Sequence, residues 1–411
     1  MTTPPAVFTQ DDLERMARSF NDFGLHLLAH LAAAARGPRN LVIAPFALAS
    51  ELAMTYLGAG GETAAAFSHL LRLDGAHRVD AIARALLNEL LGADPQASLH
   101  IANSLWVDAQ YPAEPDFIQR VQTHFDAHVG AIDATASELS ANAINQWIHA
   151  TTAGKIGQLV NAADVRGAAL LLISAVYFKA AWATMFESDA TAPAAFTRAD
   201  GSICQTPFMH LHTELTHRCI DNVQLVFLPF SAGRLGMVLA LPPAMQPFHE
   251  FQRKLDVATW SAWLQDFGQD EGDLALPRFT MRSDLHLDRA LREMGLQVAF
   301  SSAADFHKIG PGALQISDCQ HAVMLDVNEE GAEASTAKAK MMFRSLAPPP
   351  LKIVFDRPFL AAIVDIETEA ILFAGYIGDP SEGMAPAMHA AVAPKMHPGS
   401  NAGLLHGQEA E

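Results

Sequence analysis

The first third of the chain has apolar residues at helical spacing. From residue 10 onward they recur every three or four positions, and Thr9 stands before them as a candidate N-cap. This pattern predicts an amphipathic helix, whose apolar positions are Leu13, Met16, Phe20, Phe23, Leu27 and Leu31. Similar patterns predict a helix that starts near residue 47 and ends near Gly58–Gly61, a second one after it, and others over residues 76–92 and 136–156.

The middle and the end of the chain change to strand patterns. Residues 169–182 form a continuous run rich in strand formers, which is typical of a strand buried on both faces. Residues 98–108 predict an earlier strand, and residues 223–243 a hairpin. Helices are predicted at 248–267 and 286–295, with strands at 272–283, 321–330, 351–367 and 370–379. Helices early and strands late, without regular alternation, predict the α+β class with large mixed sheets.

The two ends of the chain and the length of its apolar runs allow predictions about disorder, cellular location and membrane binding. The composition changes after Pro380 to Ala, Pro, Met, His and Gly, so we expect a disordered tail over residues 381–411. The N-terminus lacks a basic region followed by an apolar stretch, so a cytoplasmic location is expected unless a leader was removed. Apolar runs are too short to cross a bilayer, and we expect no membrane partner.

Charge and motifs exclude several classes of function. A net charge of −18 disfavours binding to nucleic acid. Three scattered cysteines make neither a disulfide framework nor a zinc site. His210 and His212 share a face if they lie on a strand, which leaves a metal site open as an alternative, but we predict no metal and no cofactor. No catalytic motif is present, so the sequence does not predict an enzyme.

One stretch near the C-terminus does not fit a packed domain. "VNEEGAEASTAKAKMMFRSLAPPP" (327–350) begins as the end of a strand, continues with small residues, and stops at three prolines. Small side chains pack poorly on a surface but fit between neighbouring strands. If this segment were cut, its upstream part could enter a sheet as a new central strand and gain backbone hydrogen bonds of about 1 kcal/mol net each.

These residues also carry a family resemblance. "HAVMLDVNEEGAEASTA" (321–337) resembles the hinge of the serpins, and "VFDRPFLAAIVDIETEAILFAGYIGDP" (354–380) resembles the segment that follows their reactive loop. Five further stretches resemble serpins in the same order. They are "NLVIAPFALASELAMTYLGAGGET" (40–63), "ANSLWV" (102–107), "INQWIHATTAGKI" (144–156), "SAVYFKAAW" (174–182) and "LPRFTMRSDLHLDRALREMG" (276–295). The resemblance covers residues 8–380.

The resemblance implies a serpin fold and an inhibitor of serine proteases. The reactive loop then spans about residues 329–350. A protease would attack it as a substrate, form an acyl-enzyme, and be trapped when the cut loop inserts into the main sheet. The implied hinge consists of Glu330, Gly331, Ala332, Glu333, Ala334, Ser335, Thr336 and Ala337. We expect such an inhibitor to act as a monomer.

The reactive bond has two candidates. The single arginine Arg344 gives a trypsin-like protease its charged anchor, which favours cleavage between Arg344 and Ser345. The usual spacing counted from Gly331 instead places the bond between Ser345 and Leu346. We prefer the first, with a trypsin-like serine protease as the partner.

Two lysines disagree with a simple inhibitor. If the alternation from Ala332 continues, Lys338 and Lys340 point inward after insertion, and burial of a charge is costly without a partner. A non-inhibitory binding or chaperone serpin is therefore the alternative function, although small residues such as Ala332 and Ala334 favour inhibition.

The resemblance also implies a region that controls sheet opening. It consists of Ser174, Trp182 and His321, with Trp182 at the end where insertion begins. Serpins usually have serines where this chain has Ala44 and Ala47, and an asparagine where it has Ser174. Because Ser174 alone among these positions is left to bond His321, we expect this hydrogen bonding to be weaker or built differently.

Overall fold

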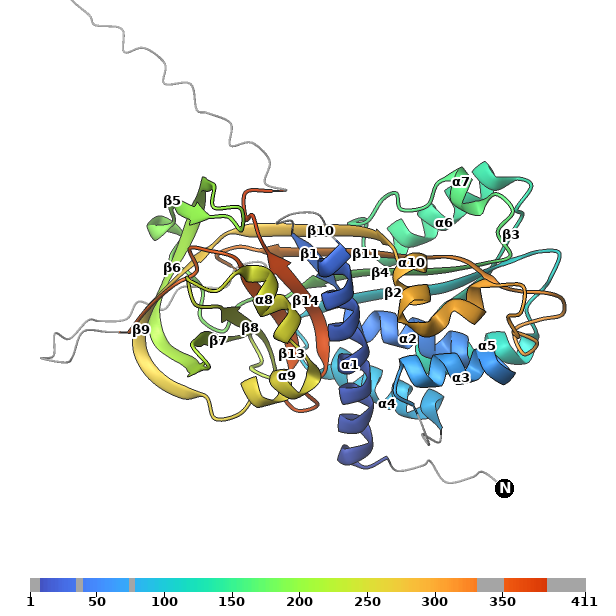
Figure 1. Cartoon of the computed structure of the whole chain (residues 1–411), viewed down its shortest axis with the longest axis horizontal. Helices are drawn as coiled ribbons and strands as arrows, with labels where there is room; N and C mark the ends of the chain where they lie inside the picture. Colours follow the sequence, from blue (N-terminus) through green and yellow to red (C-terminus); the bar gives the residue numbers. More distant parts are fainter. Residues whose placement is uncertain (1–7, 35–39, 74–77, 331–350, 383–411) are drawn as a thin grey trace, which may run out of the picture.

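The computed structural model describes residues 8–34, 40–73, 78–330 and 351–382. A five-stranded sheet runs along the molecule and meets a nine-stranded sheet at one end (Figure 1). The strands of the five-stranded sheet, in spatial order, are β10 (Phe279–His286), β11 (Ile316–Val327), β4 (Leu170–Lys179), β2 (Ser98–Asp108) and β3 (His128–Ile132). This confirms the α+β class.

Two neighbours in the middle of this sheet, β4 and β11, run parallel. Their register pairs His321 with Ser174 and Leu325 with Phe178. Each has an antiparallel neighbour on its other side, β2 for β4 and β10 for β11. We call the boundary between β4 and β11 the seam.

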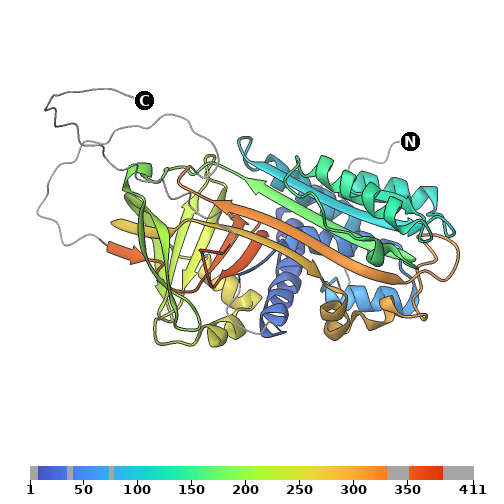
Figure 2. The same cartoon turned by 90° about the horizontal axis from the view of Figure 1, so that it is seen from above.

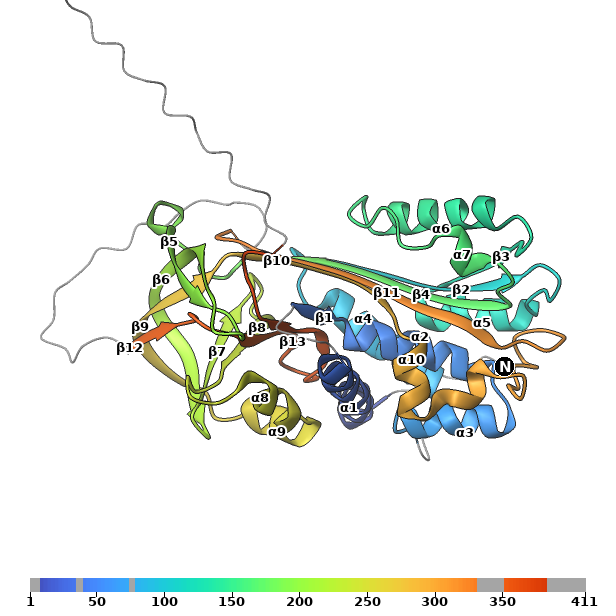
Figure 3. The same cartoon turned by 45° about the horizontal axis from the view of Figure 1, so that its top comes forward.

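Helices cover both faces of the five-stranded sheet (Figures 2 and 3). Alternate β4 side chains pack in two separate cores: Leu172 and Val176 in the core that includes α2, Ile173 and Ala175 in the core that includes α6. This double burial explains the unbroken apolar run of β4. The helices are α1 (Gln10–Ala34), α2 (Pro45–Leu57), α3 (Gly61–Leu70), α4 (Val79–Gly92), α5 (Pro115–Phe125), α6 (Ser137–Thr151), α7 (Ala162–Val165), α8 (Phe248–Lys254), α9 (Val257–Trp263) and α10 (Asp288–Leu291).

The nine-stranded sheet is built mainly from the second half of the chain. Its strands are β1 (Leu41–Ile43), β14 (Ile371–Ile377), β13 (Phe359–Asp365), β8 (Leu235–Leu241), β7 (Val223–Pro229), β6 (Ile203–Ile220), β9 (Gly268–Pro277) and β12 (Leu351–Val354), with β5 (Ala192–Thr197) paired to β6. The chain therefore leaves one sheet at the end of β11 and next enters the other at β12. Residues 331–350 connect them and lie outside the described residues.

Most predicted elements are present, but some are divided and some were missed. The strand predicted over residues 272–283 is two strands, β9 and β10, which lie in different sheets. The helix predicted over residues 248–267 is two helices, because Asp256 caps the second one by accepting a hydrogen bond from the Thr259 N–H at 2.7 Å. The sequence prediction also missed α5, although Phe117, Val121 and Phe125 are spaced by four residues and all buried. The candidate cap of α1 is confirmed, since the Asp12 N–H donates to Thr9 Oγ1 at 3.2 Å.

Two further predictions concern membrane-spanning segments and the C-terminal tail. No helix among the described residues is long and apolar enough to span a bilayer. The predicted disordered tail, residues 381–411, falls almost entirely outside the described part of the chain.

Candidate functional site

The seam has the geometry needed to accept another strand. Because β4 and β11 are parallel, a strand antiparallel to both could lie between them and form a ladder with each. The segment that begins at Asn328 follows β11 directly, at the end of the seam nearest the nine-stranded sheet. We call this end the upper end of the seam.

The predicted tryptophan lies at the upper end. The indole Nε1–H of Trp182 donates to the Asn328 carbonyl at 2.9 Å, and its ring stacks on Phe230 with centroids 4.8 Å apart. The Trp182 backbone N–H also reaches the carbonyl of Glu330, at 3.4 Å. Trp182 thus holds Asn328 and Glu330, where the predicted hinge begins.

An ion pair between a partly exposed arginine and a buried glutamate fastens the same place. Arg278 donates to Oε1 of Glu329, whose side chain is only 6% exposed, and the Thr191 hydroxyl donates to the same oxygen at 2.7 Å. Burial acts to raise the pKa of Glu329, but the hydrogen bonds from Arg278 and Thr191 outweigh it and hold the pKa below its ordinary value. The sequence prediction did not name Arg278 or Glu329 as site residues. The two lie 51 positions apart, and no local pattern links them.

The middle of the seam is fastened differently from what the sequence suggested. His321 is fully buried, and its Nε2 accepts a hydrogen bond from the Ala44 backbone N–H at 3.0 Å. The Ser174 hydroxyl is also buried but has no hydrogen-bond partner within the described chain. The backbone of Ala44 therefore supplies the bond that a side chain was expected to make. Burial lowers the pKa of His321 to about 3, so the imidazole is neutral and can accept.

A buried glutamate that the sequence did not predict as a site residue lies beneath the seam. Glu51, on α2, has no exposed surface, and neither carboxyl oxygen has a hydrogen-bond partner among the described residues. Burial raises the pKa of Glu51 well above its ordinary value. The backbone of Ile173 on β4, which lies near the carboxyl, lowers this pKa but does not offset the effect of burial. The carboxyl also acts on the thiol of Cys319 on β11, so it is close to both strands of the seam. The available signal was that Glu51 is the one charged residue in an otherwise uncharged helix.

A second polar side chain accompanies Glu51. Asn103 on β2 donates from Nδ2 to the Ala47 carbonyl at 2.8 Å, while its Oδ1 has no partner in the described part of the structure. Ala47 precedes Glu51 by one helical turn, so Asn103 and Glu51 meet the same face of α2.

The predicted reactive bond and most of the hinge cannot be placed. Arg344, Ser345 and the hinge residues 331–337 lie outside the described residues. Glu330 is described and exposed, and its N–H donates to the Asn328 side chain at 3.1 Å.

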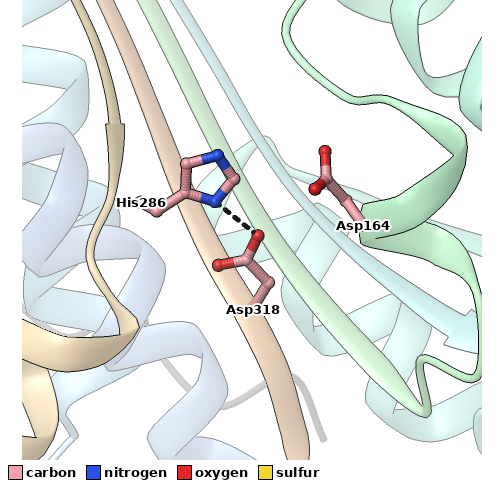
Figure 4. Close-up of side chains that lie close together, drawn as sticks. All are labelled: Asp164, His286 and Asp318. Atoms are coloured by element: carbon pink, nitrogen blue, oxygen red, sulfur yellow. Dashed lines mark hydrogen bonds and ion pairs between the residues drawn. The ribbon is translucent and has the colours of Figure 1, made fainter.

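Of the two histidines considered for a metal site, His210 and His212, the second forms an ion pair. On β6, His212 pairs with Asp273 at 2.7 Å, and His217 pairs with Asp270 at 3.0 Å. Within the described ranges, three potential metal ligands come together elsewhere, at Asp164, His286 and Asp318 (Figure 4). There His286 pairs with Asp318 at 2.8 Å, and Asp164 accepts from the Asn161 N–H within its own capping box. Hydrogen bonds and ion pairing thus account for this cluster.

Comparison with known proteins identifies the architecture around the seam. A family model described as serpin (serine protease inhibitor) matches residues 18–380. The chain belongs to the serpin family. This confirms the resemblance seen in the sequence and the serpin fold that it implied.

The proteins similar to this serpin include one named as an inhibitor and, by fold, one named as a binding protein. It is 29% identical to the leukocyte elastase inhibitor of Bos taurus, over 83% of this chain and 93% of the relative. Its fold is similar to that of native protease nexin-1 with heparin (25% identity, TM-score 0.80, covering 90% of this chain and all of the other). It is also similar in fold to human thyroxine-binding globulin complexed with thyroxine (23% identity, TM-score 0.82, covering 90% and 99%). Membership of the family therefore leaves open whether this serpin inhibits a protease.

Proposed function

We propose that this serpin inhibits a trypsin-like serine protease as a suicide substrate. The observation that carries the proposal is the seam, where two parallel strands adjoin and the segment that would enter between them starts at one end. A protease would attack the reactive bond and form an acyl-enzyme. Insertion of the freed strand would then carry the protease away and distort its active site before hydrolysis is complete.

The energetics favour insertion once the loop is cut. Opening the seam breaks one ladder, formed over Ile316–Leu325 of β11, and the inserted strand forms two. One ladder of backbone hydrogen bonds is therefore gained overall, and each hydrogen bond contributes about 1 kcal/mol net to stability. The new pairs are also antiparallel, which is slightly the more stable arrangement.

Unsatisfied polar groups under the seam add to this tendency. A buried polar atom without a partner costs about 1–3 kcal/mol, and Glu51, Asn103 and Ser174 each have at least one such atom among the described residues. The closed sheet is therefore less stable in its middle than a fully bonded sheet would be. This supports a metastable uncleaved state.

Arg344 is the proposed anchor for the protease. An arginine at the cleaved position suits the acidic pocket of a trypsin-like enzyme, and Ser345 then follows the cut. The elastase inhibitor among the relatives is consistent with a serine protease target but does not specify this preference. We propose that the inhibitor acts as a monomer.

A non-inhibitory binding or chaperone serpin is the second candidate. Lys338 and Lys340 favour it, because an inward-facing lysine without a partner would hinder insertion. Thyroxine-binding globulin has the same fold and is named for binding a small molecule.

Incubation with trypsin distinguishes the two candidates. For an inhibitor we expect a complex that survives denaturing electrophoresis, and a C-terminal peptide whose mass starts at Ser345. Arg344→Ala should abolish trapping of trypsin, whereas Arg282→Ala, on β10, should not. A peptide that starts at Leu346 would move the reactive bond. Complete cleavage without a stable complex would instead favour the binding-protein candidate.

A further inference from the structure

Three polar side chains under the middle of the seam leave acceptor oxygens unused. Asn103, Ser174 and His321 lie in one row across β2, β4 and β11. Glu51 lies beside this row, close to the backbone of Ile173 and the thiol of Cys319. Glu51, Asn103 and Ser174 are buried, and each has a side-chain oxygen without a partner within the described residues. Nε2 of the neutral His321 ring accepts from Ala44, so its other ring nitrogen carries the proton and is a donor.

This set of atoms favours a cationic donor. Carboxylate, amide and hydroxyl oxygens all accept hydrogen bonds, whereas a lysine ammonium offers three donors and no acceptor. A buried carboxylate also supplies the opposite charge that a buried ammonium requires. An apolar or anionic ligand would leave these acceptors unsatisfied.

The inserting segment carries a candidate ammonium. If the chain turns at Glu330 and Gly331, Ala332 pairs with Glu329, and each later residue pairs one position further back along β11. On this register Lys340 lies opposite His321, and directly paired residues point to the same face of a sheet. Its side chain would then enter the row of unused acceptors, next to Ser174.

The other lysine falls in a different environment. On the same register Lys338 lies opposite Val323, whose partner across the seam is Val176. Both valines belong to the apolar core. Lys338 therefore serves as the matched comparison for Lys340.

We propose that Glu51, with Asn103 and Ser174, is a preformed receptor for the ammonium of Lys340 in the inserted state. This inference rests on the proposed inhibitory function. In the closed sheet the Glu51 carboxyl holds its proton. On insertion it releases that proton to water and the resulting carboxylate pairs with the ammonium, so the buried site stays neutral overall. The lysine whose charge would otherwise oppose insertion then has a partner waiting for it.

The test compares uncleaved and cleaved forms of the full chain at neutral pH. The variants are Glu51→Gln, Lys340→Met and the double variant, each cut at the reactive bond, checked by mass spectrometry and melted. Glu51→Gln should leave the uncleaved form at least as stable, because it replaces an unsatisfied acid. The cleaved form should instead melt about 5 °C lower than the cleaved parent, because a buried ammonium has lost its counter-charge. Adding Lys340→Met should remove this loss.

Lys338→Met is the matched control and should not rescue Glu51→Gln. Equal melting of the cleaved parent and cleaved Glu51→Gln would overturn the receptor while leaving the inhibitory function intact. Rescue by Lys338→Met in place of Lys340→Met would overturn the register. If the parent itself gains no thermal stability on cleavage, the proposed function fails and the receptor fails with it.

Discussion

Replacing Glu51 with glutamine in the uncleaved protein should change how stability depends on pH. Glutamine has nearly the same shape but no proton to lose, so the comparison isolates the buried acid. The nearest titratable groups known to face it are the Cys319 thiol on β11 and, in the neighbouring row, His321. Burial and nearby carboxyl groups raise the pKa of Cys319 well above 9, so the thiol does not ionise in the range that matters here.

The sign follows from the direction of each shift. The folded-state pKa of Glu51 is raised, so the folded chain binds more protons than the unfolded chain above about pH 4.5, and stability falls as pH rises. The slope is about 1.4 kcal/mol per pH unit until the buried acid ionises. While the buried acid keeps its proton, the penalty therefore grows with each pH unit above its ordinary pKa.

His321 acts in the opposite direction over the same range. Its folded-state pKa is lowered from 6.5 to about 3, so its contribution to stability is lost as pH falls below 6.5. Between about pH 4.5 and 6.5 the two slopes cancel in the parent. Glu51→Gln should therefore lose stability on acidification, where the parent stays nearly flat.

Chemical unfolding of both proteins from pH 4.5 to 8 measures this difference. We expect the free energy of unfolding of the variant to match that of the parent near pH 4.5 and to exceed it increasingly as pH rises, by about 1 kcal/mol per pH unit. Glu62→Gln, at an exposed glutamate on α3, is the control and should show no such trend. A gap between Glu51→Gln and the parent that stays constant with pH would show that Glu51 is not a neutral buried acid, and the reasoning would fail.

Two further predictions concern the upper end of the seam. Arg278→Ala should lower the free energy of unfolding by about 2 kcal/mol, because it leaves the buried carboxylate of Glu329 without a cation. The effect is reduced by the partial exposure of Arg278. The control Arg282→Ala removes an exposed ion pair on β10 and should change the free energy of unfolding little. The pKa of Glu329 is lowered in the folded state, so the stability that its ion pair contributes should be present above about pH 4.5. This stability should be lost as pH falls through the lower folded-state pKa. Acid unfolding of the parent and of Arg278→Ala would measure the loss. Trypsin should still cleave Ala332→Arg, but the variant should neither trap trypsin nor gain melting temperature on cleavage. The reason is that the first residue to enter the sheet would carry a charge, which is costly to bury. Stable trapping of trypsin by this variant would contradict the insertion mechanism.

The sequence predicted elements well where the pattern was local. The strand at 98–108 and the continuous apolar run of β4 could be recognised from their residue types and the pattern of apolar positions alone. The partners at the site were not, because they come from distant parts of the chain. His321 is bonded to the backbone of Ala44, 277 positions away, and a backbone donor leaves no mark in the side-chain sequence. The long β6 was missed as an element because its burial pattern is irregular.

The distribution of bonds along the seam suggests where its opening is controlled. The upper end is fastened by an ion pair and by several hydrogen bonds to Asn328, Glu329 and Glu330. The middle instead holds acceptors without partners among the described residues. A strand that passes the upper end thus moves toward groups that it can satisfy, so each later step is easier than the first. On the proposed insertion mechanism, release of Glu329 from Arg278 and of Asn328 from Trp182 would be the barrier that keeps the uncleaved protein closed, and pairing of Glu51 would help to complete insertion.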